Sequence, residues 1–424
     1  MDNTHLYNKL LLGLIVVCSA WAPQTLAEGA IGFEAALQAT LNNHPALKGK
    51  TAEVDAKGYA AEAARALRYP SLSAELSSDD TNADVFSLTA VQPLWAFGRI
   101  DSAIAYADAD IIVESAELLQ IKRDLIEQTA VAYARVLRVH HSLKVTLANI
   151  ASFEQLYQQI KRRELGQRAS LADVKLAWTR LLQAQAKKNE LDGNLMVVKN
   201  ELVALTQYPV DATQAVPETL KLLPITAQIL ALALAQSAEV SVKTQAISLA
   251  RANVEREKFS AMPTLYLQAV HRDNSSNAFL SGTTVSIKLA ADLDSMGFAA
   301  IGANKAAAAT LQAAMFDLNT TSNEFSRMVN AHIANRYAQN NLINSQQESV
   351  QALTEILASY QRQYVAGKKS WLEVLNMQRE LAEQRLQLVQ ANNNWLVYTL
   401  RLATLTGNLD ALSSRPDKFS RESE

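Results

Sequence analysis

Residues that could carry acid–base, nucleophilic or metal chemistry are few and scattered in this sequence. The six histidines are His5, His44, His140, His141, His271 and His332. None of them has a carboxylate at the spacing that places two metal ligands on one face of a helix. The stretches "GQRAS" and "GKKS" lack the earlier glycine and the preceding strand of a phosphate-binding loop. The sequence therefore predicts a protein that is not an enzyme and that holds no metal and no cofactor.

The composition indicates a nearly neutral protein made of long elements. Its 424 residues include 40 Lys and Arg against 42 Asp and Glu, a net charge of -2. This balance argues against nucleic acid or an acidic lipid surface as the main partner. Only 13 Gly and 9 Pro are present, which favours long helices over many turns.

The N-terminus has the features of an export signal, predicted over residues 1–27. Lys9 supplies positive charge, "LLLGLIVVCSAWA" is a short apolar core, and "TLAEGA" offers a cleavage site after Ala27. Cys18, the single cysteine, lies within it and follows Val17, where a lipid-anchor signal needs a small residue. We expect no lipidation, no disulfide and no Cys-based metal site. No other segment is apolar enough for a membrane helix, so insertion into a membrane would require a barrel.

An internal duplication organises the rest of the chain. Residues 47–76 match residues 240–269, and the stretch from Ser170 matches the stretch from Ser370. Each half is predicted to contain a helix, two strands, a long helix, a turn and a helix. The predicted divisions are a first repeat over 28–209, a linker over 210–235, a second repeat over 236–408 and a tail over 409–424.

The helical parts predict a rod rather than a compact bundle. Between Ile104 and Ile160, apolar residues recur with the three-and-four spacing of a coiled-coil seam. A helix of about sixty residues spans roughly 90 Å. Two shorter helices, predicted over 31–68 and 171–206, would match that length if they were stacked end to end.

Four short segments alternate between apolar and polar residues: 71–77, 86–90, 265–269 and 284–289. They predict two hairpins, of strands about eight to ten residues long, with one apolar and one polar face. Such a sheet commonly covers a soluble core, but here the remaining chain is committed to long helices. We therefore expect the apolar face to meet lipid. Four strands cannot close a barrel, so the fold predicted is mainly α, with a 12-stranded barrel and a helical tunnel shared by a homotrimer.

The chain resembles the TolC-like outer membrane factors over essentially all of its mature length, the duplication included. The resemblance rests on "QPLWAFGR" (92–99), on the turn "ELGQRASLADV", and on the C-terminal stretch that begins "YVAGKKSWLEV" and ends "LATLTGNL". The first-half turn has one more residue between Gly166 and Asp173 than the resemblance leads us to expect. The family implies a short barrel in the outer membrane and a long helical tunnel across the periplasm.

The stretch 92–99 lies where strand must become helix. Pro93 cannot donate to a sheet ladder and is expected to end the strand pairing. Gly98 can adopt backbone angles that let the chain change direction. Trp95 and Phe97 suit either the bilayer interface or ordinary packing between barrel and helix. The second half has only "DLDSMGFAAI" here and is expected to make this junction differently.

The resemblance also implies an entrance gate at the periplasmic tip, closed at rest by the second-half helix pair. The matching positions are Tyr364, Lys369 and Glu373, with Asp173 as the acidic partner of Tyr364 and Lys369 on the first helix pair. Asn376 replaces a second carboxylate, which leaves one ring of three carboxylates and argues against strong cation selectivity. The alternative is a solvated helix turn without a gating role.

The function implied is a passive export duct. Its partners would be a periplasmic adaptor that docks on the tip, an ATP-driven inner-membrane transporter, and outer membrane lipid. The stretch "GKKSWLEVLNMQREL" is similar to the branch that serves type I protein secretion, whereas other branches export small toxic compounds. The alternatives are a periplasmic coiled-coil adaptor or scaffold without a barrel, against which two tandem hairpins argue, and a soluble structural rod.

Overall fold

A computed structural model describes residues 32–78, 84–210, 212–222, 226–274, 282–291 and 297–410. The predicted signal peptide with Cys18, and nearly all of the predicted tail, lie outside the described residues. The first half contains α1 (Phe33–Asn43), α2 (Pro45–Ala66), β1 (Ser71–Ser78), β2 (Asp84–Trp95), α3 (Arg99–Leu165) and α4 (Leu171–Thr206). A short 3-10 helix, η1 (Glu218–Lys221), follows. The second half contains α5 (Thr226–Gln236), α6 (Ala238–Phe259), β3 (Thr264–Asn274), β4 (Gly282–Ala290), α7 (Phe298–Val365) and α8 (Trp371–Leu405).

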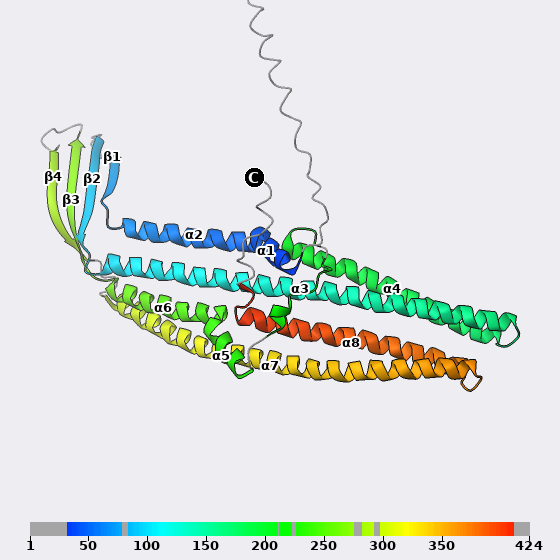
Figure 1. The fold of residues 1–424 in the computed structure, drawn as a ribbon. Coiled ribbons are helices and arrows are strands. Elements are labelled where there is room, and N and C mark those ends of the chain that lie inside the picture. The colour runs from blue at the N-terminus through cyan, green and yellow to red at the C-terminus, as the bar shows by residue number, and fades with distance from the viewer. Residues whose placement is uncertain are drawn as a thin grey trace, which may run out of the picture.

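The element order repeats as the sequence predicts. The series α2-β1-β2-α3-α4 recurs as α6-β3-β4-α7-α8. The helices form an elongated body, with α2 and α4 along α3 and with α6 and α8 along α7 (Figure 1). The two longest helices, α3 and α7, have 67 and 68 residues, or about 100 Å each. The sheet lies at one end of this body, and the α3–α4 and α7–α8 turns lie at the other. Among the described residues, no helix combines the length and apolarity needed to cross a membrane.

One predicted helix is wrong: the segment 31–68 forms two helices rather than one. His44 has an extended backbone, with φ −63° and ψ 125°, and separates α1 from α2. Pro45 is the physical reason, because its ring disfavours helical angles in the preceding residue and it has no N–H to donate. The Nδ1 atom of His44 accepts a hydrogen bond from the Ala46 backbone N–H at 3.3 Å and so helps to start α2. The other flanking helix, 171–206, coincides with α4.

The four strands form a single antiparallel sheet in the order β1-β2-β3-β4. Its register pairs apolar residues with one another, such as Leu72 with Ala90 and Ala269 with Val285. One face is therefore mostly apolar, as the alternation predicts, although Gln92, His271 and Asp273 also lie on it. The apolar members of this face are Leu72, Ala74, Leu76, Phe86, Leu88, Ala90, Leu265, Leu267, Ala269, Val285, Ile287 and Leu289. Both β2, with 12 residues, and β3, with 11, are longer than the sequence predicts.

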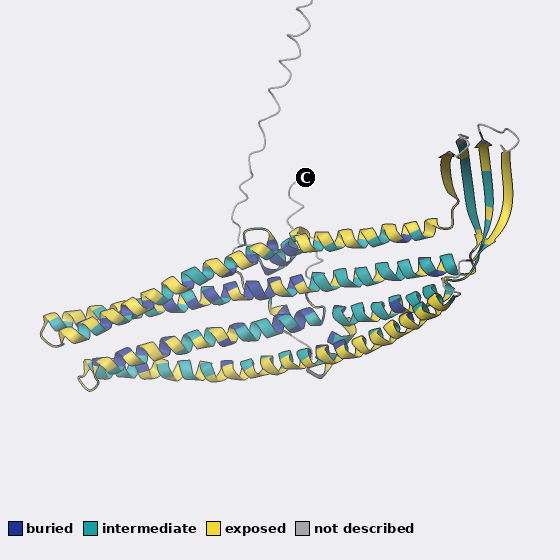
Figure 2. Ribbon diagram, turned by 180° about the vertical axis from the view of Figure 1, so that it is seen from behind, coloured by how far each residue is buried: buried dark blue, intermediate teal, exposed yellow. Residues whose placement is uncertain are grey.

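Buried side chains gather in the middle of the helical body, whereas α2, the outer strands β1 and β4 and much of α7 are exposed (Figure 2). The largest fully buried side chain is Tyr133 of α3. Its hydroxyl donates to the Gln214 backbone carbonyl at 2.9 Å, and its ring meets Phe33 of α1 edge-on at 5.3 Å. This cluster joins α1, α3, α4, α8 and the segment between the halves, so it fixes the helical hairpins at their base.

Candidate functional site

The turns at the far end of the two helical hairpins have the same backbone structure. In the first, the Gln167 N–H donates to the Glu164 carbonyl at 2.8 Å, and in the second the Gly367 N–H donates to the Tyr364 carbonyl at 3.1 Å. Gln167 and Gly367 both have a left-handed backbone, with φ of 57° and 72°. The extra residue expected after Gly166 is therefore not an insertion. The left-handed position of the first turn is Gln167, and the two turns have equal length.

Each turn leads into a capped helix. The Ser170 hydroxyl oxygen accepts from the Asp173 N–H at 3.1 Å, and Asp173 Oδ2 accepts from the Ser170 N–H at 3.2 Å. Ser370 and Glu373 form the same reciprocal pair at 3.3 and 2.9 Å. These capping boxes satisfy N–H groups that the first turn of a helix leaves without partners. The two predicted gate carboxylates thus serve first as helix caps.

Lys369 pairs within its own turn. Its Nζ lies 2.6 Å from Glu373 Oε1 and 4.4 Å from the centre of the Tyr360 ring. The hydrogen bond from Lys369, together with those from Ser370, lowers the pKa of Glu373 to about 2, and the bond to Glu373 raises the pKa of Lys369. The predicted contact between Lys369 and Asp173 is not formed in the described single chain. Asn376 is exposed on α8.

Tyr364 links the two hairpins through residues that the sequence analysis did not select. The guanidinium of Arg163, at the end of α3, lies 4.2 Å from the centre of the Tyr364 ring, and the Trp371 ring lies 5.2 Å away. Trp371 is 5% exposed and belongs to an apolar cluster contributed by α3, α4, α7 and α8. No local signal in the sequence selects Trp371, since Leu171 at the equivalent position after the Ser170 cap is 59% exposed.

The junction between sheet and helix corrects one prediction. Pro93 does not end the pairing, because β2 continues to Trp95 beside Leu265 of β3 after a register shift between Pro93 and Trp95. A proline inside a sheet is tolerated at such a bulge, where the ladder is already irregular. Trp95 and Phe97 stack on each other, with ring centres 4.5 Å apart, and Trp95 is 62% exposed.

A left-handed glycine begins the long helix in both halves. Gly98 has φ 91° and precedes α3, and Gly297 has φ 86° and precedes α7. A positive φ at Gly98 is the kind of backbone angle that the expected turning role requires. The positive φ of Gly297 shows that the second half keeps this feature of the junction, contrary to our expectation, although residues 292–296 lie outside the described part of the chain.

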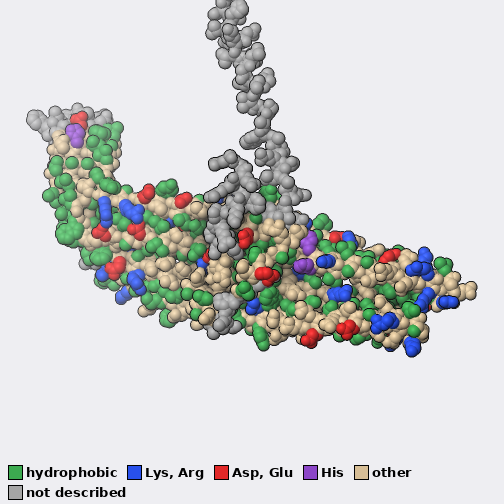
Figure 3. Space-filling view, viewed as in Figure 1, with side chains coloured by type: hydrophobic (Ala, Val, Ile, Leu, Met, Phe, Trp, Pro, Cys, Tyr) green, Lys and Arg blue, Asp and Glu red, His purple; other side chains and the backbone are tan. Residues whose placement is uncertain are grey.

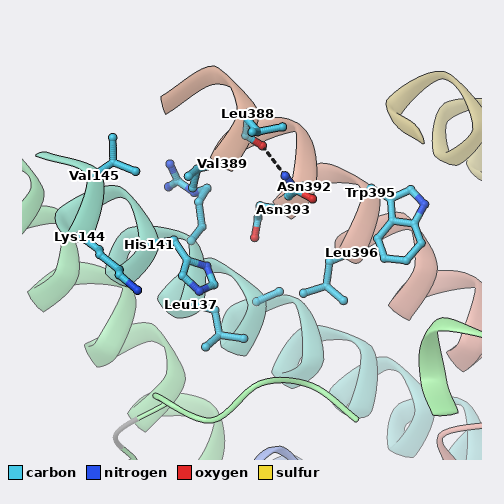
Figure 4. A pocket seen from close by; sticks show the side chains of 12 residues that line it. Leu137, His141, Lys144, Val145, Leu388, Val389, Asn392, Asn393, Trp395 and Leu396 are labelled. Atoms are coloured by element: carbon cyan, nitrogen blue, oxygen red, sulfur yellow. Dashed lines mark hydrogen bonds between the residues drawn. The ribbon is translucent and has the colours of Figure 1, made fainter. Parts of the chain in front are cut away.

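A cavity of about 410 Å³ lies between α3 and α8, nearer the middle of the helical body. Figure 4 shows Leu137 and Leu396 on its apolar wall, with His141 and Lys144 on the α3 side. The hydrogen bond drawn there runs from Asn392 Nδ2 to the Leu388 carbonyl at 2.8 Å. Its lining residues include no Ser or Cys that His141 could activate and no Asp or Glu that could orient His141.

Comparison with known proteins decides the family. The family model described as outer membrane efflux protein matches residues 36–207 and 229–408, which together make up most of the chain. The chain belongs to the outer membrane efflux protein family. Like the family, this efflux protein is an outer membrane protein with a large periplasmic portion, and it is not an enzyme.

Relatives of this efflux protein agree with the fold. The alkaline protease secretion protein AprF of Pseudomonas aeruginosa is 23% identical over 350 residues, which cover 78% of this chain and 71% of AprF. The crystal structure of CusC, reported in connection with folding and transmembrane channel formation, has a TM-score of 0.78 at 19% identity and covers 88% of this chain and 91% of CusC. The outer membrane protein VceC of Vibrio cholerae has a TM-score of 0.75 at 18% identity, covering 88% of this chain and 96% of VceC. These similarities extend over both halves of the fold.

Proposed function

We propose that three copies of this chain form one passive export duct. Each copy would contribute its four strands to a 12-stranded barrel in the outer membrane and its helices to a tunnel across the periplasm. The main support is the sheet, whose outer strands β1 and β4 each have a neighbour on one side only. Its apolar face is open, with Leu76 74% and Ile287 68% exposed. Neighbouring copies would pair these edges, and lipid would cover that face.

The helical body supports the same assembly. At about 100 Å, α3 and α7 are long enough to extend far from the membrane. The hairpin turns at their ends would receive a periplasmic adaptor and an inner-membrane transporter, which would be ATP-driven and would supply the energy. Outer membrane lipid and the other two subunits complete the set of partners, and nucleic acid is not among them.

Protein is the favoured cargo, in the manner of type I secretion. The support is the printed name of AprF, an alkaline protease secretion protein, together with the similarity of the stretch 367–381 to that branch. Small toxic compounds are the other candidate cargo. A deletion strain that stops secreting a protein but keeps its resistance to toxic compounds would support protein export. The reverse pattern would contradict it.

The entrance gate is proposed at Tyr364, Lys369, Glu373, Asp173 and Asn376. Tyr364 touches the first hairpin through Arg163, so this turn is placed to respond to movement between the hairpins. In a closed trimer, Lys369 would leave its ion pair with Glu373 and form one with Asp173 instead. Both carboxylates occupy the third position of their helices, so either can accept from a lysine without losing its cap. An exposed ion pair contributes only about 0–1 kcal/mol, so a docking partner could release the latch.

Conductance of the purified protein in planar bilayers tests the duct and the gate. We expect Lys369→Ala to raise the conductance, whereas Lys368→Ala, at the exposed neighbouring position, should leave it unchanged. Glu373→Gln removes three charges per trimer while retaining a capping side chain, and it should lower the preference for cations. Glu380→Gln, which is exposed on α8, is its control. A stable water-soluble monomer would overturn the duct itself, and unchanged conductance in Lys369→Ala would overturn only the gate.

A further inference from the structure

A cavity of about 380 Å³ lies between the two hairpins where their ends meet. Its walls come from the last turns of α3 and α7 and the first turn of α8. The side chains on it that can donate a hydrogen bond include those of Ser152, Gln155, Gln159, Arg162, Arg163 and Gln361. None of the described residues that line it is acidic. A cavity rich in donors and without a carboxylate matches an anionic guest.

The two arginines differ in how they are held. The Arg163 guanidinium packs over the Tyr364 ring at 4.2 Å, so its position is set by the contact between the hairpins. Arg162 is exposed, and its Nε donates to the Gln158 carbonyl at 3.2 Å. Among the described residues, neither arginine has a carboxylate within 4.0 Å of its guanidinium nitrogens. Both charges therefore remain available to a ligand.

The surroundings of the cavity are positive as well. We define the helical tip as residues 158–180 and 358–380. The first range has six Lys and Arg against two Asp and Glu, and the second has four against two, a net charge of +6 in a chain whose total is -2. Figure 3 shows Lys and Arg gathered at this end of the body. Two of the four carboxylates, Asp173 and Glu373, are held by helix N-termini, which offset their charge.

Trp371 adds an unused donor to the wall. Its ring is 5% exposed, and its Nε1–H has no acceptor among the described residues. A buried donor without an acceptor is unfavourable, and an acceptor oxygen supplied by a ligand would satisfy it.

The geometry points to an oxyanion-binding site in this cavity, where Arg162 and Arg163 bind a carboxylate or phosphate group. The guanidinium fork is suited to such groups, because two N–H donors can bind two oxygens of the same anion. The group could belong to a free small anion in the duct entrance or to an acidic side chain of a docked protein. Neither source depends on the channel being open, so the site can be tested apart from the proposed function.

Calorimetric titration of the purified full-length protein tests the site, with inorganic phosphate as the first probe. We expect saturable binding of one anion per chain that weakens as the salt concentration rises. Arg162→Gln should lower the affinity about tenfold or more, because it removes a charged donor but no contact between the hairpins. Arg180→Gln is the matched control, since it removes the same charge from the helical tip but does not line the cavity. It should retain most of the affinity.

A second titration, with a short Glu-rich peptide as the probe, distinguishes a free small anion from an acidic side chain of a docked protein. Tighter binding of the peptide than of phosphate assigns the site to acidic side chains of a protein, and the opposite order assigns it to small anions. The inference is overturned if wild type shows no saturable binding of either probe. Equal weakening in Arg162→Gln and Arg180→Gln would also overturn it, because the binding would then reflect only the general positive charge of the tip.

Discussion

Arg163 and Tyr364 form a cation–π contact, at 4.2 Å, that joins the end of the first helical hairpin to the end of the second. The two residues are about two hundred positions apart in the sequence and belong to different repeats. Behind them, Trp371 and the apolar cluster of the tip pack α3 and α4 against α7 and α8. The cation–π contact and the apolar cluster therefore both connect the two hairpin ends.

A double-mutant cycle can measure this coupling. We expect Arg163→Ala and Tyr364→Leu to show an interaction free energy of about 0.5–1 kcal/mol, the range for a partly exposed cation–π pair. Unfolding by denaturant, followed by circular dichroism, gives the four free energies. A second cycle with Arg180→Ala in place of Arg163→Ala should give no coupling. Additive effects in the first cycle would contradict the link.

The two junction glycines offer a matched comparison. Gly98→Ala and Gly297→Ala both place a Cβ on a left-handed backbone, which costs about 1–2 kcal/mol. At Gly98 the new Cβ would also lie 3.1 Å from Cδ1 of Phe259, whereas at Gly297 no atom of the described residues outside its own chain neighbours lies within 4 Å. We expect Gly98→Ala to lower the free energy of unfolding more than Gly297→Ala does. Combining Gly98→Ala with Phe259→Leu should remove the difference, and equal losses in the two single variants would show that Phe259 plays no part.

Gln167 occupies a backbone conformation that favours glycine. Its φ of 57° strains the backbone of a residue that has a Cβ, whereas the counterpart Gly367 has no Cβ and is not strained. Gln167→Gly should raise the free energy of unfolding by about 1–2 kcal/mol, and Gly367→Gln should lower it by a similar amount. Gly166→Ala is the control, because Gly166 has an ordinary negative φ. A loss of stability in Gln167→Gly would mean that the Gln167 side chain contributes more than its strain costs.

Asp124 gives a pH dependence with a definite sign. Partial burial raises the pKa of its carboxyl group, although the residue as a whole is exposed. The folded protein therefore holds this proton more tightly than the unfolded chain, and stability is lost as the pH rises through the raised value. Asp124→Asn should stabilise the protein by about 0.5–1 kcal/mol at pH 7, a modest value because the group keeps part of its hydration.

The gain from Asp124→Asn should disappear as the pH falls below about 4, the ordinary pKa of an aspartate. There the Asp124 side chain is protonated in both the folded and the unfolded chain, so it is as neutral as an asparagine. Thermal unfolding followed across this pH range measures the gain. Asp55→Asn, on the exposed face of α2, should give no such gain. A gain that persists unchanged into acid would assign the effect to packing rather than to the charge.

Much of the fold could be predicted because it depends on short-range patterns. The three-and-four spacing of apolar residues indicates α3, and the alternation in the strands indicates which side chains share a face of the sheet. Repetition of both patterns indicates the two halves. Local chemistry also explains the main miss among the helices, since Pro45 could have been recognised as a helix start.

The contacts within the candidate site could be predicted from the sequence less well than the fold could, because they depend on tertiary structure. The sequence by itself determined that the chain is duplicated, that each half joins a strand hairpin to a long helical hairpin, and that a glycine turns the chain between them. Only the tertiary structure decided that Arg163 meets Tyr364, that Trp371 packs among all four helices of the tip, and that Pro93 lies beside β3 within a continuing strand. The physical reason is that periodicity reports on neighbours three or four residues away. Contacts between side chains two hundred residues apart depend instead on how two rigid helices are placed, to within a few ångströms.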